Sequence, residues 1–308
     1  MRITRSRLII PINVKKFVNN SYKRNADAIV LDLEDSIPYD QKEIARDLIR
    51  SAVKPAAAGG NRLYIRVNAE KTVQKKDIHA SVLPEVHGVI LPKVETREDI
   101  GIVDEQLDQL DPEQRIQISV LIETSKGIRN IDAILSASTR IESVSLGAED
   151  LASELNLGNG PQREELLRHV RYTMLLSAKA HHVQPLALMG SISNYKDVGK
   201  VREAAVNAYQ LGFEGNSCIH PGQVQILNDS FSPDKETAEE AQRLIEVFEE
   251  SVAQGRASMV FKDKMIDYPH YEQAKQLVEF HNDIIAFETK KADARKRWEE
   301  MQHEEGSS

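Results

Sequence analysis

The sequence of 308 residues predicts a (β/α)₈ barrel followed by a helical extension at its C-terminal end. Eight short β-rich runs recur in about the first 220 residues, which is the number that such a barrel needs. Segments with helical spacing separate them, such as the one that carries Ile44, Leu48 and Ile49. The strand rhythm stops after Pro221, and amphipathic helical sequence follows. Regular strand and helix alternation favours a barrel, with a doubly wound sheet as the second possibility.

The predicted strands are rich in β-branched and other apolar residues. They cover residues 8–10, 28–33, 63–67, 88–91, 116–122, 143–146, 184–188 and 215–219. Segments between them repeat apolar residues at helical spacing, as in the stretch from Leu166 to Leu175. We therefore place the catalytic barrel in residues 1–232.

The remaining residues, 233–308, predict a helical extension. Residues 234–254 form a charged amphipathic pattern that Ser232 and Pro233 precede, and a second helix follows Pro269. Its far end, residues 290–305, mixes both charge signs and is expected to be a solvated terminus. Because the extension is long and amphipathic, we expect it to pack on a neighbouring subunit of a homo-oligomer.

The composition is that of a soluble globular protein, with 41% apolar and 29% charged residues. A net charge of −8 argues against a nucleic acid or an anionic membrane as the main partner. The single cysteine, Cys218, excludes an internal disulfide and predicts a buried, inert thiol. No apolar stretch approaches the roughly 20 residues of a membrane span or resembles a signal peptide. The sequence predicts a cytoplasmic protein.

Polar residues close several of the predicted strands, and in a barrel catalytic groups lie at these carboxyl ends. Asp32 and Glu34 close the second strand, Arg66 the third, Glu123 the fifth, and Asp150 follows the sixth. Carboxylates from adjacent strand ends can share a cation, and oxygen ligands without a Cys or His cluster favour Mg²⁺ or Mn²⁺. Each acid taken singly is explained as well by a helix cap or a salt bridge.

Eight sequence segments resemble the citrate lyase beta subunit-like (CitE-like) branch of the HpcH/HpaI aldolases. They follow the order of that family between about residue 5 and residue 280 and read RSRLIIPIN, ADAIVLDLEDS, LYIRVN, VILPKVE, IETSKG, LGAEDLA, GFEGNSCIHP and KMIDYPHYEQA. The resemblance implies a Mg²⁺-dependent (β/α)₈ barrel that makes or breaks a carbon–carbon bond next to a thioester, usually of coenzyme A. It also implies that the homo-oligomer is a trimer or a dimer of trimers.

The resemblance assigns roles to the residues at the predicted site. Glu123 and Asp150 would be the protein ligands of Mg²⁺. Arg66 would pair with the thioester or carboxylate oxygen and stabilise the enolate, although a strand-end salt bridge also explains it. Asp32 and Glu34 would accept hydrogen bonds from water around the metal.

Further roles follow from positions nearer the ends of the chain. Asp267 would handle the proton of the substrate hydroxyl from a neighbouring subunit, unless it only caps the helix before Pro269. Lys16 and the chain at Ser217 and Cys218 would hold the thioester substrate, while a solvated surface position explains Lys16 equally well.

The chain departs from the family pattern at the rim that selects substrates. Ile12 replaces a glycine of the first turn, and Gly190 and Ser191 stand where an aspartate is expected near the end of the seventh strand. Asn216 stands where relatives usually have a lysine, and FKDKMID lacks the glycine that usually precedes this segment. These changes leave the acid substrate open.

These residues and the family resemblance together imply a Mg²⁺-dependent acyl-CoA lyase, which performs retro-aldol cleavage of a malyl-CoA or citramalyl-CoA type thioester. One alternative is a citrate lyase beta subunit that works on a thioester of an acyl carrier protein. Another is a non-catalytic homologue that binds a CoA ester without turning it over, although Glu123, Asp150, Arg66 and Asp267 are all present.

Overall fold

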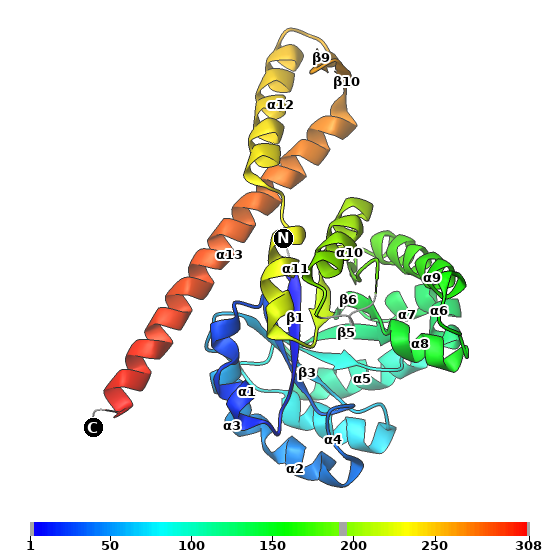
Figure 1. Cartoon of the computed structure of the whole chain (residues 1–308), viewed down its shortest axis with the longest axis vertical. Coiled ribbons are helices and arrows are strands. Elements are labelled where there is room, and N and C mark those ends of the chain that lie inside the picture. The colour runs from blue at the N-terminus through cyan, green and yellow to red at the C-terminus, as the bar shows by residue number, and fades with distance from the viewer. Residues whose placement is uncertain (1–2, 191–195, 307–308) are drawn as a thin grey trace. The chain divides into compact units, whose positions relative to one another are not determined.

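The computed structural model describes residues 3–190 and 196–306 and divides into two compact units. Among the described residues, the barrel unit contains those between Thr4 and Phe231 and the final segment 292–306. The extension unit contains Ser232–Lys291 together with Ile3. Figure 1 shows the elements of both units. The departure noted at Ser191 lies outside the described residues.

Eight parallel strands form the predicted barrel, which is thereby confirmed. They pair in the order β7-β6-β5-β4-β3-β2-β1-β8. One backbone hydrogen bond, from the Glu214 N–H to the Pro185 oxygen at 3.0 Å, links the beginnings of β7 and β8 at the ends of this order. The strands are β1 Ser6–Pro11, β2 Ala28–Asp32, β3 Arg62–Arg66, β4 Gly88–Leu91, β5 Gln117–Ile122, β6 Ile141–Leu146, β7 Gln184–Leu186 and β8 Asn216–Cys218.

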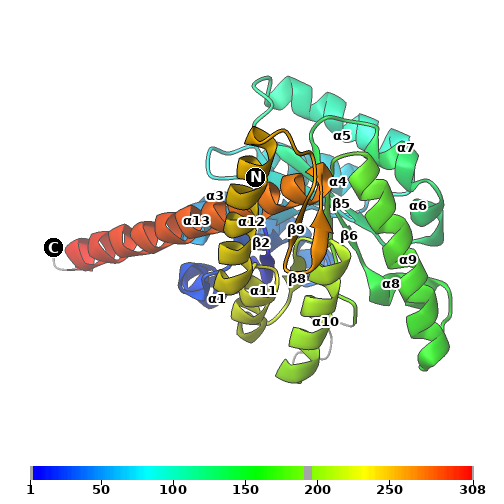
Figure 2. The same ribbon diagram turned by 90° about the horizontal axis from the view of Figure 1, so that it is seen from above.

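Helices surround the strands, as the view from above in Figure 2 shows. Their apolar faces pack on the outer face of the barrel in one large core that includes Leu31, Leu63 and Ile118. Local signals set several starts: Thr96 and Asp99 form a capping box at α5, and Pro161 opens α9. The helices are α1 Lys15–Asn19, α2 Lys42–Asp47, α3 Ile49–Ala57, α4 Lys71–Ser81, α5 Arg97–Leu110, α6 Ser125–Arg129, α7 Ile131–Leu135, α8 Ala148–Glu154, α9 Pro161–Ala180, α10 Val198–Leu211 and α11 Val224–Ser230, with short 3₁₀ turns at Ser21–Arg24, Tyr39–Gln41 and Pro221–Gln223.

The inside of the barrel is polar towards the amino ends of the strands. The Arg7 guanidinium donates to the Ser119 hydroxyl at 2.7 Å and to the Ser143 hydroxyl at 2.8 Å. It also lies 4.5 Å from the centre of the Tyr64 ring. These side chains fill the amino end of the barrel, so the carboxyl ends of the strands are the expected place for a substrate site.

Gly215 allows the last strand to reach the first. A Cβ at this position would lie 2.1 Å from the Thr4 carbonyl oxygen, which is backbone and cannot move aside. We expect Gly215→Ala to lower the free energy of unfolding by about 2 kcal/mol or more. Gly101 in α5 is the matched control, since a Cβ there meets nothing within 4 Å and alanine should stabilise the helix by about 1 kcal/mol. Equal urea unfolding midpoints for the two variants would contradict this.

The extension unit contains two helices and a hairpin. Helix α12, Lys235–Ala253, follows the pattern seen in the sequence, and Asp234 caps it by accepting from the Thr237 N–H at 2.7 Å. A β-hairpin of β9, Met259–Phe261, and β10, Lys264–Ile266, was not predicted. The Phe248 ring stacks on Tyr271 with centroids 5.0 Å apart, which joins α12 to the start of α13, Tyr268–Gly306.

The end of α13 is exposed at residues 299–304, as expected of a solvated terminus, but residues just before it contact the rest of the barrel unit. Within the barrel unit, the Trp298 ring lies against Tyr22 with centroids 6.5 Å apart, and the Arg295 guanidinium donates to the Asn25 side-chain oxygen at 2.6 Å. This segment is mostly charged, so its composition gives no sign that Trp298 packs on the barrel unit.

None of the helices in the described ranges has both the length and the apolar character that a membrane span requires.

Candidate functional site

A cavity of about 550 Å³ opens at the carboxyl ends of the barrel strands. Its apolar wall includes Ile9, Pro11, Phe17, Ile90, Leu121, Leu146, Leu188 and Ile219. Its charged lining residues are Asp32, Asp35, Arg66, Glu123, Glu149, Asp150 and Arg171. Apolar surface with a few convergent charged groups is typical of a small-molecule site.

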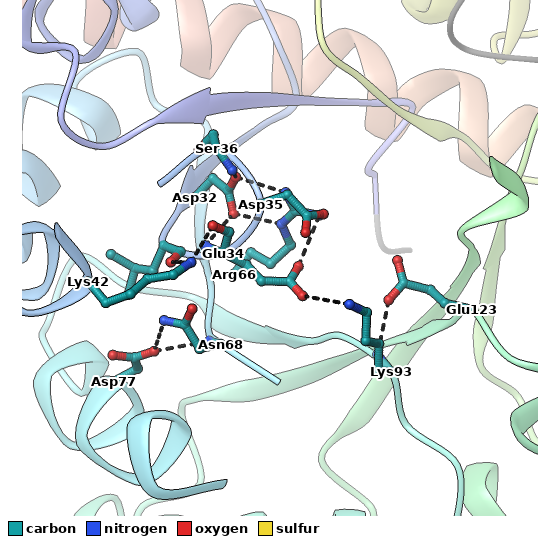
Figure 3. Close-up of polar contacts among 11 residues, drawn as sticks. Asp32, Glu34, Asp35, Ser36, Lys42, Arg66, Asn68, Asp77, Lys93 and Glu123 are labelled. Carbon is teal, nitrogen blue, oxygen red and sulfur yellow. Dashed lines mark hydrogen bonds and ion pairs between the residues drawn. The ribbon is translucent and has the colours of Figure 1, made fainter. Parts of the chain in front are cut away.

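Arg66 and Asp32 form the central ion pair of this cavity. Both end their strands and are register partners between β2 and β3. The Asp32 carboxylate accepts from the Arg66 Nε at 2.7 Å and Nη2 at 2.8 Å, and from the backbone N–H groups of Glu34 and Ser36 (Figure 3). Burial raises the pKa of Asp32, but the hydrogen bonds and charge of Arg66 outweigh it and lower that pKa. The pair therefore stays ionised.

The third nitrogen of Arg66 faces two further acids. Nη1 donates to the Asp35 carboxylate at 3.2 Å and lies 3.4 Å from Glu34 Oε2. Burial lowers the pKa of Arg66, yet its hydrogen bond to Asp32 and the surrounding acids raise it overall. Arg66 thus forms the strand-end ion pair that the sequence allowed, and it also lines the cavity.

Two lysines stabilise the site, Lys42 through backbone carbonyls and Lys93 through carboxylates. The Lys42 ammonium donates to the Leu33 carbonyl at 2.8 Å and to the Glu34 carbonyl, which ties down the loop after β2. The Lys93 backbone N–H donates to Glu123 Oε2 at 3.1 Å, and its ammonium lies 3.9 Å from Glu34 Oε1 (Figure 3). Lys93 has a φ of 53°, a left-handed conformation that is unusual for a residue other than glycine.

Glu34 and Glu123 are buried acids with raised pKa values. Burial raises the pKa of Glu34 to about 7. Burial, assisted by the charges of Glu34 and Asp150, raises the pKa of Glu123 to about 8. Glu34 Oε2 has no hydrogen-bond partner among the described residues. The mutual repulsion of these acids would be relieved by a cation between them.

The donor set fits a hard divalent cation. Glu123 and Asp150 both line the cavity, and Asp150 is exposed in the first turn of α8. In the described ranges no group of three or more His, Cys, Asp or Glu side chains is arranged to hold a metal. The protein would therefore supply two carboxylates, and water and substrate would complete the octahedron that Mg²⁺ prefers.

Gly147 makes room for Glu123. Leu146 at the end of β6 is the register partner of Ile122 at the end of β5, so the residues that follow lie side by side. A Cβ on Gly147 would be 2.5 Å from Glu123 Cγ and 2.6 Å from Oε1. Any larger residue would push the Glu123 carboxylate out of position.

Of the three residues expected to hold a thioester, one lines the cavity, one is buried in the core and one is exposed on the surface. Ser217 lines the cavity. The Cys218 side chain, 1% exposed, packs into the core outside the barrel, and burial raises its thiol pKa to about 12, as expected for an inert thiol. Lys16 is exposed on α1, and it is its neighbour Phe17 that contributes to the cavity wall.

Two of the residues that depart from the family pattern line the cavity, and a third is buried in the core. Ile12 is buried in the outer core. Gly190 and Asn216 line the cavity, and the Asn216 side-chain amide donates to the Ser217 carbonyl at 2.5 Å. Asp267 belongs to the extension unit, where it precedes α13, is half-exposed and contacts His270.

Three charged cavity residues were missed by sequence reasoning, namely Asp35, Glu149 and Arg171. Asp35 directly follows Glu34 and Glu149 directly precedes Asp150, so the signal in both cases was a second acid beside a predicted site acid. Arg171 comes from the middle of α9 and is far in sequence from any strand end. Its signal was a cation within the buried face made by Leu167, Val170 and Met174.

Comparison with known proteins agrees with this arrangement. The HpcH/HpaI aldolase/citrate lyase family model matches residues 5–221. "Citrate lyase subunit beta" of Haemophilus influenzae is 30% identical over an alignment of 285 residues, which covers 91% of this chain and 97% of that protein. "(3S)-malyl-CoA thioesterase" of Cereibacter sphaeroides is 31% identical over 92% of this chain and 96% of that protein.

A solved structure is similar over most of both chains. It is the protein CitE from Mycobacterium tuberculosis in complex with magnesium, acetoacetate and coenzyme A, with a TM-score of 0.70 and 26% sequence identity. The alignment covers 90% of this chain and 97% of that one. The barrel, its strand-end acids and these similarities lead to one conclusion: the chain belongs to the HpcH/HpaI aldolase/citrate lyase family.

Proposed function

We propose that this protein is a Mg²⁺-dependent carbon–carbon lyase that cleaves the acyl-CoA thioester of a hydroxy acid by a retro-aldol reaction. The observation that carries the proposal is the placement of Glu123, Asp150 and Arg66 around one cavity at the carboxyl ends of the strands. The relatives support it, since they include citrate lyase subunits and a similar structure that contains magnesium and coenzyme A. Malyl-CoA and citramalyl-CoA represent the substrate class that the sequence predicts.

In the proposed reaction, Mg²⁺ held by Glu123 and Asp150 would supply positive charge to the oxygens of the acid half. A base removes the hydroxyl proton, the carbon–carbon bond breaks, and the acid leaves as a 2-oxo acid. The electron pair passes to the thioester half as an enolate, which a proton then converts to the acyl-CoA product. Arg66 stabilises the enolate oxygen, because Asp32 holds its guanidinium fixed and charged.

The proposal gives different roles to the two acids of the loop after β2. Asp32 is committed to Arg66 and to two backbone N–H groups. Glu34 Oε2 is left to accept from water around the cation. We keep Lys16, Ser217 and the backbone at Cys218 as proposed contacts of the thioester arm. Phe17 and Ile219 add apolar surface beside them.

The direct test is a screen of the purified protein against malyl-, citramalyl- and citryl-CoA. We expect at least one to be cleaved to an acyl-CoA and a 2-oxo acid, with loss of activity in EDTA and recovery on adding Mg²⁺. Release of free CoA with the hydroxy acid intact would instead indicate thioester hydrolysis. Cleavage only on an acyl carrier protein would indicate the citrate lyase alternative, and binding without turnover a non-catalytic homologue.

Gly147→Ala tests the geometry of the site. The added methyl group must displace Glu123, and misplacement of a reacting group by about 1 Å can cost about 10²-fold in rate. We therefore expect about a 10²-fold fall in kcat/KM together with weaker Mg²⁺ binding. Gly158→Ala is the control, because a Cβ there meets nothing within 4 Å. Wild-type kinetics in both variants would show that Glu123 is not part of the active site.

Assembly and location remain proposals from the sequence. We propose a trimer or dimer of trimers, with residues 233–308 at the contacts and the catalytic barrel in residues 1–232. Exposed Val260 and Met265 on the hairpin support a contact surface, being 72% and 74% exposed. A cytoplasmic location is likewise proposed.

A further inference from the structure

A second arginine lines the cavity, on the side of β7. Arg171 lies on α9 among Leu167, Val170 and Met174, and it is only 3% exposed. Arginine is almost never this buried unless a counterion or a ligand accepts its hydrogen bonds. The proposed mechanism gives its guanidinium no partner, although the guanidinium lies at the same cavity.

The contacts of Arg171 do not satisfy its guanidinium. Within the described ranges, Nη2 donates to the Gly190 carbonyl at 3.2 Å. The nearest ion pair is with Glu164, whose Oε2 lies 3.9 Å from Nη1 and belongs to a half-exposed side chain. A guanidinium has five N–H donors. Arg66, in contrast, makes two short hydrogen bonds to one carboxylate and a third to Asp35.

Arg171 lies on the side of the cavity where the acid half of the substrate would bind. Glu123 follows β5, Asp150 follows β6, and the Gly190 carbonyl that Arg171 contacts follows β7. Arg66 lies on β3, on the opposite side of the two acids in the strand order. A substrate that places its enolate at Arg66 and its hydroxyl carbon near Glu123 and Asp150 therefore extends its remaining substituent towards Arg171.

We propose that Arg171 is a specificity-determining residue that pairs with a carboxylate on this substituent. The inference rests on the proposed function and narrows its substrate class. The substituent on the hydroxyl carbon is hydrogen in malyl-CoA, methyl in citramalyl-CoA and carboxymethyl in citryl-CoA. Only the last offers a second anion, so Arg171 favours an acid half that leaves as a 2-oxo dicarboxylate. This revises the malyl-CoA or citramalyl-CoA expectation while keeping the same bond cleavage.

The test compares two acids that differ by this carboxylate. Binding of oxaloacetate and of pyruvate is measured by calorimetry with saturating Mg²⁺, on wild type, Arg171→Gln and Arg168→Gln. We expect wild type to bind oxaloacetate at least about tenfold more tightly, as a charged hydrogen bond provides. Arg171→Gln should reduce this preference to less than about threefold. Arg168→Gln, an exposed position one turn earlier on α9, should leave it unchanged.

The outcomes separate this inference from the proposed function. Equal wild-type affinities, or a preference that survives in Arg171→Gln, would overturn the inference and leave the lyase proposal standing. Absence of Mg²⁺-dependent binding of either acid, with no thioester cleaved, would overturn both. If Arg171→Gln does not fold, Arg171→Lys serves as the second variant, because it keeps the positive charge but lacks the planar, bidentate guanidinium. It should show a reduced preference for oxaloacetate and an unchanged affinity for pyruvate.

Discussion

Glu123→Ala should abolish Mg²⁺ binding and lower turnover by at least about 10³-fold, while the barrel remains folded. The ion contributes several kcal/mol of transition-state stabilisation in such sites, and each 1.4 kcal/mol is about a factor of ten. Glu123 is 3% exposed, lies over Gly147 and is one of two carboxylates that the proposed site offers. Calorimetric titration with Mg²⁺ and the thioester assay measure the two losses.

The stability of a Glu123 variant gives an independent readout. Burial raises the pKa of Glu123 to about 8, above the value of 4.5 that it has when exposed. A folded state that holds this proton more tightly than the unfolded state loses stability as pH rises from about 4.5 to about 8. Metal-free Glu123→Gln should therefore be more stable than metal-free wild type at pH 8, and the difference should vanish below pH 4.5.

The matched control is Glu98→Ala, which removes an exposed carboxylate from the first turn of α5. It should change neither Mg²⁺ affinity nor turnover. Unchanged Mg²⁺ affinity in Glu123→Ala would show that the metal lies elsewhere.

Asp267→Asn is expected to lose about 10²-fold or more in kcat while Mg²⁺ and acyl-CoA binding persist. General base catalysis contributes about 10²- to 10⁴-fold, and an amide cannot accept the hydroxyl proton. The side chain is 51% exposed, so the substitution should not unfold the extension unit. Asp263→Asn in the hairpin is the control, because asparagine also tolerates its φ of 60°.

A mixing experiment tests whether Asp267 acts from a neighbouring subunit. Inactive Glu123→Ala and inactive Asp267→Asn proteins are unfolded together and reassembled. Some interfaces would then combine an intact Glu123 from one parent with an intact Asp267 from the other, and activity should return in part. Full activity of Asp267→Asn alone would show that Asp267 only caps the helix and takes no part in catalysis. Mixed assemblies that stay inactive would exclude action across subunits.

Much of the barrel and part of its site could be predicted from the sequence. β-rich runs and helical spacing predicted eight strands within a few residues of their observed ends. Parallel strands must end at one rim, so acids that close β2, β5 and β6 could be expected around one cavity before any coordinates existed. The hairpin of β9 and β10 escaped notice because its strands have three residues each and carry exposed apolar side chains.

The sequence by itself determined the strand and helix rhythm and which residues stand at the carboxyl ends, because both depend on neighbours along the chain. Only the tertiary structure decided that Asp32 holds Arg66, that Gly147 lies under Glu123, and that Arg171 reaches the cavity from the middle of α9. It also showed that Trp298 anchors a segment whose composition suggests a solvated end. These contacts join residues far apart in sequence, and side-chain packing across the assembled barrel selects them.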